Sequence, residues 1–218
     1  MKTSYTVLIP SYKSTEYIEE AINSVLNQTI QADEIIIGTN IKAQELKNKL
    51  ETYLKDPRFK FLDVGGEEIQ KPSRKFNMIA EIATSTHLIF LCEDDMLCPT
   101  FIEEVSQYPE YDVVYTDMEV IGMNPHYEKA QEWNAENFRQ STVPFVNSVV
   151  KKDMWSKIKW RDEGYSFFDW DFWWRCFKAG ATAKHIEKYL FLYRTHPKQD
   201  SNFVNMALAR ENTIKNNV

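Results

Sequence analysis

Apolar runs typical of buried strands alternate with helical segments over residues 1–98. The runs are short and rich in isoleucine, valine and leucine, and they cover residues 5–12, 33–39, 59–64 and 86–93. Apolar side chains at helical spacing fill the segments between them, at residues 14–29, 41–56 and 73–83. Strands that alternate with helices of this length form a mostly parallel sheet with helices on its faces. We therefore predict an α/β, Rossmann-like fold.

The rest of the chain is less regular. Helices are expected at residues 99–108 and 167–180, a strand at 111–122, and a strand pair or a strand and loop at 183–196. Ordered structure is also expected at residues 147–158. Residues 124–145 have little periodicity, so we predict loops with a short helix that act as a mobile lid over a bound ligand.

Length, charge and cysteine content narrow the class of protein. A chain of 218 residues fits one domain and buries a sizeable core without disulfides. A net charge of -6 argues against nucleic acid as the main partner. The three cysteines, Cys92, Cys98 and Cys176, have no paired spacing, which favours a reducing compartment. No apolar run reaches the roughly 18 residues of a membrane span, so we predict a cytoplasmic protein.

Polar residues follow the predicted strands at the edge where parallel sheets bind ligands. Pro10 and Ser11 end the first strand, and Glu93, Asp94 and Asp95 follow the fourth. Adjacent carboxylates repel one another, and a cation or a hydrogen-bonded ligand offsets that repulsion. Mg²⁺ or Mn²⁺ held by one or two carboxylates and a diphosphate fits this pattern, whereas a polar loop is the plain alternative. No glycine-rich phosphate loop is present.

Three motifs in order resemble the family-2 glycosyltransferases of GT-A fold. The first is "LIPSYKSTEYIEEAINSVLNQT", beginning at Leu8. The second is the acidic cluster of "LIFLCEDD", which resembles the metal motif of that family. The third is "FDWDFWWRCFKAG" together with the later "YRTH", which resembles the acceptor-side motif. The resemblance covers nearly the whole chain and implies a single GT-A domain, residues 1–98 binding the nucleotide-sugar and residues 99–218 binding the acceptor.

The resemblance also implies roles for individual residues. Asp95 is the expected ligand of Mn²⁺ or Mg²⁺, and His196 looks like a further metal or diphosphate ligand. Asp169 matches the catalytic base that takes the proton of the acceptor hydroxyl, although it also stands where a helix N-cap belongs. Trp170 and Asp171 are expected on the acceptor side, although tryptophans at helical spacing are more often core. The expected donor-binding residues are Pro10, Ser11, Tyr12, Asn40, Lys75, Asn77 and Asp94.

The resemblance favours a UDP-linked sugar over a GDP-linked one. Arg74 and Lys75, at the start of a predicted helix, are candidates to meet the donor phosphates, and an exposed basic helix start is the equal alternative. The acceptor would carry a hydroxyl on a glycan, a lipid-linked sugar or another molecule. A DNA base is disfavoured by the acidity of the chain but is not excluded.

Three positions depart from the family pattern. The acids that usually follow the second strand are missing from "IIIGTNIK", where Thr39 or Asn40 stands instead. Cys92 replaces the first acid of the metal motif, and Phe168 replaces the acid before the base. The first interpretation is a metal-dependent, inverting glycosyltransferase. The alternatives are a catalytically idle nucleotide-sugar binding module and, with less support, a nucleotidyltransferase.

Overall fold

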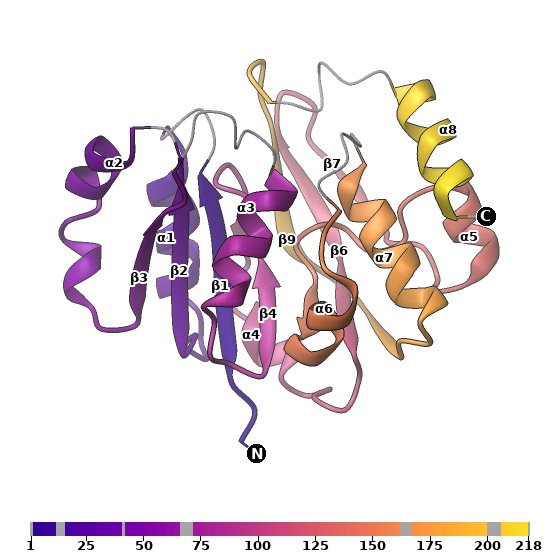
Figure 1. The fold of residues 1–218 in the computed structure, drawn as a ribbon, viewed down its shortest axis with the longest axis horizontal. Helices are drawn as coiled ribbons and strands as arrows, with labels where there is room; N and C mark the ends of the chain where they lie inside the picture. Colours follow the sequence, from indigo (N-terminus) through magenta and orange to yellow (C-terminus); the bar gives the residue numbers. More distant parts are fainter. Residues whose placement is uncertain are drawn as a thin grey trace.

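The computed structural model describes residues 2–11, 16–40, 42–65, 72–161, 167–199 and 206–217. Within these ranges the strands form one sheet with the order β3-β2-β1-β4-β8-β6-β9-β5, and β7 pairs with β6 at the side. Helices flank the sheet on both faces (Figure 1). No described helix combines the length and the apolar character that crossing a membrane requires.

The N-terminal half has the predicted alternation of strands and helices. The strands are β1 (Tyr5–Ser11), β2 (Glu34–Thr39), β3 (Phe59–Asp63) and β4 (His87–Phe90), and they pair with one another in parallel. The helical elements between them are α1 (Ile18–Leu26), α2 (Ala43–Lys49), the 3₁₀ helix η1 (Tyr53–Lys55) and α3 (Pro72–Glu81). The predicted helices are therefore present, but each is shorter than its apolar pattern.

Side-chain alternation along the strands supplies two separate cores. Val7 and Ile9 of β1 pack on one face, in the cluster that holds the buried side of α1. Leu8, between them, points to the opposite face and packs with Phe76 and Ile79 of α3. Figure 1 shows α3 on the near face of the sheet and α1 on the far face. Strands covered on both faces read as continuous apolar runs, which is what the sequence contains.

The C-terminal half makes the sheet mixed rather than all parallel. Its strands are β5 (Met96–Leu97), β6 (Val113–Gly122), β7 (His126–Glu128), β8 (Val149–Lys151) and β9 (Ala183–Thr195). Its helices are α4 (Phe101–Val105), α5 (Ala135–Gln140), α6 (Lys152–Ile158), α7 (Phe168–Lys178) and α8 (Met206–Asn217). β8 lies antiparallel between β4 and β6. Of the two alternatives expected at 183–196, the strand pair is wrong and the strand followed by a loop is confirmed, because β9 is one strand that pairs with both β6 and β5.

The short helix predicted in residues 124–145 is present, and the action of this segment as a lid stays a prediction. The segment contains β7 and α5, and Phe138 of α5 is fully buried. The indole of Trp170 donates to the carbonyl oxygen of Phe138 at 2.8 Å, and the indole of Trp133 donates to that of Ala181 at 3.2 Å. These hydrogen bonds fasten α5 to α7 and Trp133 to Ala181, which follows α7.

Gly38 permits the close approach of α3 to β2. A Cβ atom added at Gly38 would overlap Cγ2 of Ile79, which is fully buried. We expect Gly38→Ala to destabilise the protein by about 1 to 3 kcal/mol, the usual range for overpacking a core. Urea unfolding measures this loss. In an Ile79→Ala background the loss should largely disappear, and a penalty that persists there would contradict the steric explanation.

Candidate active site

The turn after β4 is fixed to the end of β1. The backbone N–H of Leu91 donates to the carbonyl oxygen of Leu8 at 3.0 Å. The hydroxyl of Ser11 donates to Oε2 of Glu93 at 2.5 Å. The ammonium of Lys75, fully buried on α3, donates to the carbonyl oxygen of Ser11 at 2.9 Å. The structure thus brings together two predicted donor-binding residues, Ser11 and Lys75, beside the acidic turn.

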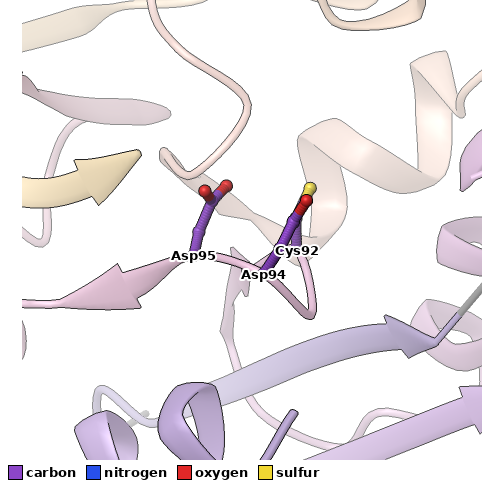
Figure 2. Close-up of side chains that lie close together, drawn as sticks. All are labelled: Cys92, Asp94 and Asp95. Carbon is purple, nitrogen blue, oxygen red and sulfur yellow. The ribbon is translucent and has the colours of Figure 1, made fainter. Parts of the chain in front are cut away.

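Cys92, Asp94 and Asp95 form a compact cluster in this turn. The backbone N–H of Asp95 donates to the carbonyl oxygen of Cys92 at 3.2 Å and closes the turn. The sulfur of Cys92 and one carboxylate oxygen of each aspartate all lie within 4.8 Å of one another. Figure 2 shows the side chains of Cys92 and Asp94 projecting in the same direction, with that of Asp95 close beside them.

Burial changes the acidity of two members of this cluster. Asp95 is 1% exposed, and desolvation, followed by the charge of Asp94, raises the pKa of its carboxyl group well above the usual range. Desolvation also raises the pKa of the Cys92 thiol, and the charges of Asp95, Asp94 and Asp169 add to the effect. A bound cation would relieve both penalties, because it favours the charged form of each group.

The end of β9 reaches the same cluster. The backbone N–H of Arg194 donates to Oδ1 of Asp95 at 2.9 Å, and its Nε donates to the carbonyl oxygen of Asp94 at 3.0 Å. Nε2 of His196 lies 3.1 Å from Oδ2 of Asp94. Of the two predicted metal ligands, Asp95 belongs to the compact cluster, whereas His196 contacts Asp94 and is not part of that cluster among the described residues. Sequence reasoning missed Arg194, although it stands inside the "YRTH" motif.

Asn147 completes the surroundings of Asp95. Because β8 runs antiparallel to β4, the residues just before Val149 arrive at the carboxyl end of β4. Nδ2 of Asn147 lies 3.5 Å from Oδ2 of Asp95. Asn147 is 2% exposed, and its Oδ1 has no hydrogen-bond partner among the described residues. The buried carboxylate of Asp95 and the unpaired amide oxygen of Asn147 are both oxygen ligands. They fit a site for Mn²⁺ or Mg²⁺, which prefer oxygen ligands.

Asp169 faces this cluster from the first turn of α7. Burial raises the pKa of its carboxyl group to about 6, and hydrogen bonds from its own backbone N–H and that of Trp170 limit the rise. Its charge contributes to the raised pKa of Cys92, so it acts on the turn after β4. The residue that precedes the helix is Phe167, so Asp169 is not the N-cap.

The residues after Asp169 belong to the interior. Trp170 is 3% exposed, and its indole is bound to the backbone of α5. Asp171 is 2% exposed and pairs with Arg161 at 3.1 Å and with Arg175 at 2.8 Å. These contacts are those of a structural network, and none of them lends support to the predicted acceptor-side roles.

The other predicted donor-binding residues are placed differently. The side-chain amide of Asn77 pairs with the backbone of Trp160, donating to its carbonyl oxygen at 2.7 Å and accepting from its N–H at 3.0 Å. Pro10 pairs in register with Gly38 at the ends of β1 and β2, and Asn40 follows β2 directly. Tyr12 lies outside the described residues. Asn77 is thus committed to joining α3 to the segment after α6.

Comparison with known proteins identifies the family. The family model described as Glycosyl transferase family 2 matches residues 6–174, which include nearly all of β1, the acidic turn and the first turns of α7. The chain belongs to glycosyl transferase family 2. The resemblance seen in its three motifs is therefore confirmed, and the chain is a glycosyltransferase by family.

Named relatives of this glycosyltransferase cover most of its length. An uncharacterised glycosyltransferase of Methanocaldococcus jannaschii is 26% identical over 92% of this chain and 73% of the relative. The O-antigen biosynthesis glycosyltransferase WbnJ of Escherichia coli is 24% identical over 88% of this chain and 80% of WbnJ.

Solved structures confirm the fold. A crystal structure of S. aureus TarS in complex with UDP-GlcNAc has a TM-score of 0.76 and 14% identity, covering 94% of this chain and 62% of the TarS chain. A TarS structure in complex with UDP has a TM-score of 0.72 at 15% identity and covers 89% of this chain. This glycosyltransferase spans about three fifths of the length of those TarS chains.

Proposed function

We propose that this glycosyltransferase moves a sugar from a UDP-linked donor to a hydroxyl acceptor, with inversion at the anomeric carbon and in a metal-dependent reaction. The observation that carries the proposal is the compact cluster of Cys92, Asp94 and Asp95 at the end of β4 in a chain of this family. Asp169, on α7, is close enough for its charge to raise the pKa of Cys92. A base and a carboxylate cluster from distant parts of the chain thereby face one site. Direct displacement requires that arrangement, because the attacking hydroxyl loses its proton opposite the leaving diphosphate.

Asp169 has the acidity that a general base requires. With a pKa of about 6, its carboxyl group is largely ionised at neutral pH. The raised pKa also makes it a stronger base than an exposed aspartate, so it takes a proton more readily from an alcohol. We assign it the proton of the acceptor hydroxyl.

The donor side is assigned to the turn after β4 and the ends of the first two strands. Asp95 and His196 would hold a Mn²⁺ or Mg²⁺ ion, with Asp94 contacting the ribose or the sugar of the donor. Such an ion supplies positive charge against the departing diphosphate. Arg194 fixes the turn through two hydrogen bonds. The remaining donor-binding residues that we propose are Pro10, Ser11, Tyr12, Asn40 and Lys75.

The choice of donor and acceptor rests on similarity. TarS, which shares the fold, has been solved with UDP and with UDP-GlcNAc, and this favours a UDP-sugar over other nucleotide-sugars. WbnJ is named for O-antigen biosynthesis, and this favours a glycan or a lipid-linked sugar as the acceptor. We assign the donor to residues 1–98 and the acceptor to residues 99–218.

A thermal-shift panel of UDP, GDP, CDP and dTDP, each with and without Mn²⁺, tests this function. We expect UDP with Mn²⁺ to raise the melting temperature of the wild type, because a ligand that binds only the native state stabilises it. Asp95→Ala should weaken the Mn²⁺-dependent binding of UDP by about tenfold or more, since the loss of a group that merely orients a metal ligand already costs that much. Asp153→Ala, an exposed acid on α6, is the matched control and should behave as the wild type.

The outcome separates the candidate functions. If another nucleotide raised the melting temperature instead of UDP, the donor would be a sugar linked to that nucleotide. Binding without transfer to any acceptor would favour the idle binding module, which the missing acids after β2 also suggest. No shift with any nucleotide would contradict the proposed function.

A further inference from the structure

The donor set at the acidic turn contains sulfur as well as oxygen. In the described part of the chain, Cys92, Asp94 and Asp95 together form the group whose ligand atoms are close enough to share a cation. Oxygen ligands favour hard ions such as Mg²⁺, whereas a thiolate favours softer ions such as Zn²⁺, Co²⁺ and Cd²⁺. The cysteine therefore bears on which ion this turn prefers.

The spacing of these atoms is compatible with one shared ion. Zinc lies about 2.3 Å from sulfur and about 2.1 Å from oxygen in a tetrahedral site, so two of its ligand atoms are about 3.4 to 3.6 Å apart. The sulfur and the two carboxylate oxygens are all within 4.8 Å of one another. The side chain of Cys92 already projects alongside that of Asp94 (Figure 2). Binding one ion would require the three atoms to draw closer together than that upper limit of 4.8 Å.

A second, independent observation points to a ligand at this place. Oδ1 of Asn147 is buried and has no hydrogen-bond partner among the residues that the structure describes, while its Nδ2 lies 3.5 Å from Asp95. An unpaired buried oxygen costs about 1 to 3 kcal/mol, so it is normally satisfied by a donor or an ion. The side-chain amide of Asn147 thus lies beside Asp95, and its oxygen is available to accept a hydrogen bond or to bind an ion. Cys92, Asp94, Asp95 and Asn147 together offer one sulfur and several oxygens.

We propose that Cys92 is a metal ligand and that it shifts the preference of this site from Mg²⁺ toward thiophilic divalent ions, Zn²⁺ and Co²⁺ among them. The inference deepens the proposed function, since it concerns the metal of the same site. Binding forms a bond between the sulfur and the ion and breaks the S–H bond, and the proton leaves to the solvent. On this inference Asp94 joins Asp95 as an oxygen ligand of the ion, in place of the contact to the ribose or sugar of the donor that the proposed function gives it.

Absorption spectroscopy with Co²⁺ tests the proposal without any turnover assay. A cobalt–thiolate bond produces a sulfur-to-metal charge-transfer band, which oxygen and nitrogen ligands do not give. We expect this band in the wild type, with or without UDP, and its loss in Cys92→Ser. Cys98→Ser, a half-buried cysteine whose thiol donates to the backbone of Tyr189, is the matched control and should keep the band.

Affinity measurements give a second readout. Cys92→Ser should weaken Zn²⁺ and Co²⁺ binding by about 10- to 100-fold, whereas Mg²⁺ binding should change less than about threefold. Cys92→Asp, which supplies an oxygen ligand, should instead strengthen Mg²⁺ binding relative to Zn²⁺. Circular dichroism and melting temperatures confirm that each variant is folded.

The outcomes separate this inference from the proposed function. A wild type that binds UDP with Mn²⁺ but gives no thiolate band overturns the inference and leaves the proposed function intact. A thiolate band that depends on Cys92 in a protein that binds no nucleotide supports the inference and contradicts the proposed function. A band that survives in Cys92→Ser, or that disappears equally in Cys98→Ser, also overturns the inference.

Discussion

Asp169→Asn should lower the transfer rate by about 10²- to 10⁴-fold, the usual contribution of a general base. The amide is nearly the same size as the carboxylate but cannot accept the proton of the acceptor. Binding of UDP with Mn²⁺ should stay within about twofold of the wild type, because Asp169 is proposed to act on the acceptor and not on the donor. Steady-state kinetics and calorimetry measure the two quantities separately. An Asn variant with unchanged turnover would contradict the role of Asp169.

The pH profile gives a further test of the same residue. Only the ionised carboxylate accepts a proton, so the rate of the wild type should rise with pH through about 6 and then level off. The residual rate of Asp169→Asn should lack this limb, because the titrating group is gone. A limb at the same pH in the variant would assign it to another group.

The stability of the wild type should fall as pH rises, whereas its activity should rise. Asp169 has a pKa of about 6 in the folded protein and one near 4 when unfolded, so its ionisation destabilises the fold as pH rises through 6. Asp169→Asn should therefore stabilise the protein by about 1 to 3 kcal/mol at about pH 8, and this gain should disappear near pH 4. Asp153→Asn, which removes an exposed charge on α6, should do neither. Urea unfolding at the two pH values measures the difference.

Three of the first four strands, β1, β2 and β4, could be predicted because each is covered on both faces. The remaining strand, β3, lies at the edge of the sheet and exposes Lys60 and Asp63. All seven residues of β1 and all six of β2 are buried, so their sequences are continuous apolar runs with little ambiguity. Chain direction then placed the polar residues at one edge of the sheet, and Ser11 indeed meets Glu93 there. The contact of His196 with Asp94 could not be predicted from chain direction, because His196 follows β9. Only the family resemblance connected it to the turn.

The parts that escaped prediction depend on strand order and side-chain direction. Asn147 reaches Asp95 only because β8 inserts antiparallel between β4 and β6, and nothing in residues 141–148 signals this pairing. Asn77 and Asp169 both lie on predicted helices, yet Asn77 turns to the backbone of Trp160 while Asp169 faces the acidic turn. A sequence pattern places residues on elements, but it does not say which contacts their side chains make.

Asp171→Ala should cost about 3 to 5 kcal/mol of unfolding free energy, because removing one partner of a buried ion pair leaves the other charge uncompensated. Asp171 is 2% exposed and pairs with both Arg161 and Arg175. Its Oδ1 also accepts from Nδ2 of Asn217 at 2.9 Å, so the same carboxylate fastens α8 to α7. Chemical denaturation of the variant and the wild type measures the loss.

Two matched variants separate this structural role of Asp171 from the predicted acceptor-side role. Arg161→Ala removes the more exposed partner, whose side chain is 37% exposed, and should cost only about 0 to 1 kcal/mol. Asp171→Asn keeps the shape and most hydrogen bonds, so the fraction that remains folded should have a nearly unchanged KM for the acceptor. A raised acceptor KM with unchanged stability would instead support the acceptor-side role. The structural network predicts the reverse, since the carboxylate of Asp171 is directed at arginines and at the C-terminal turn of α8.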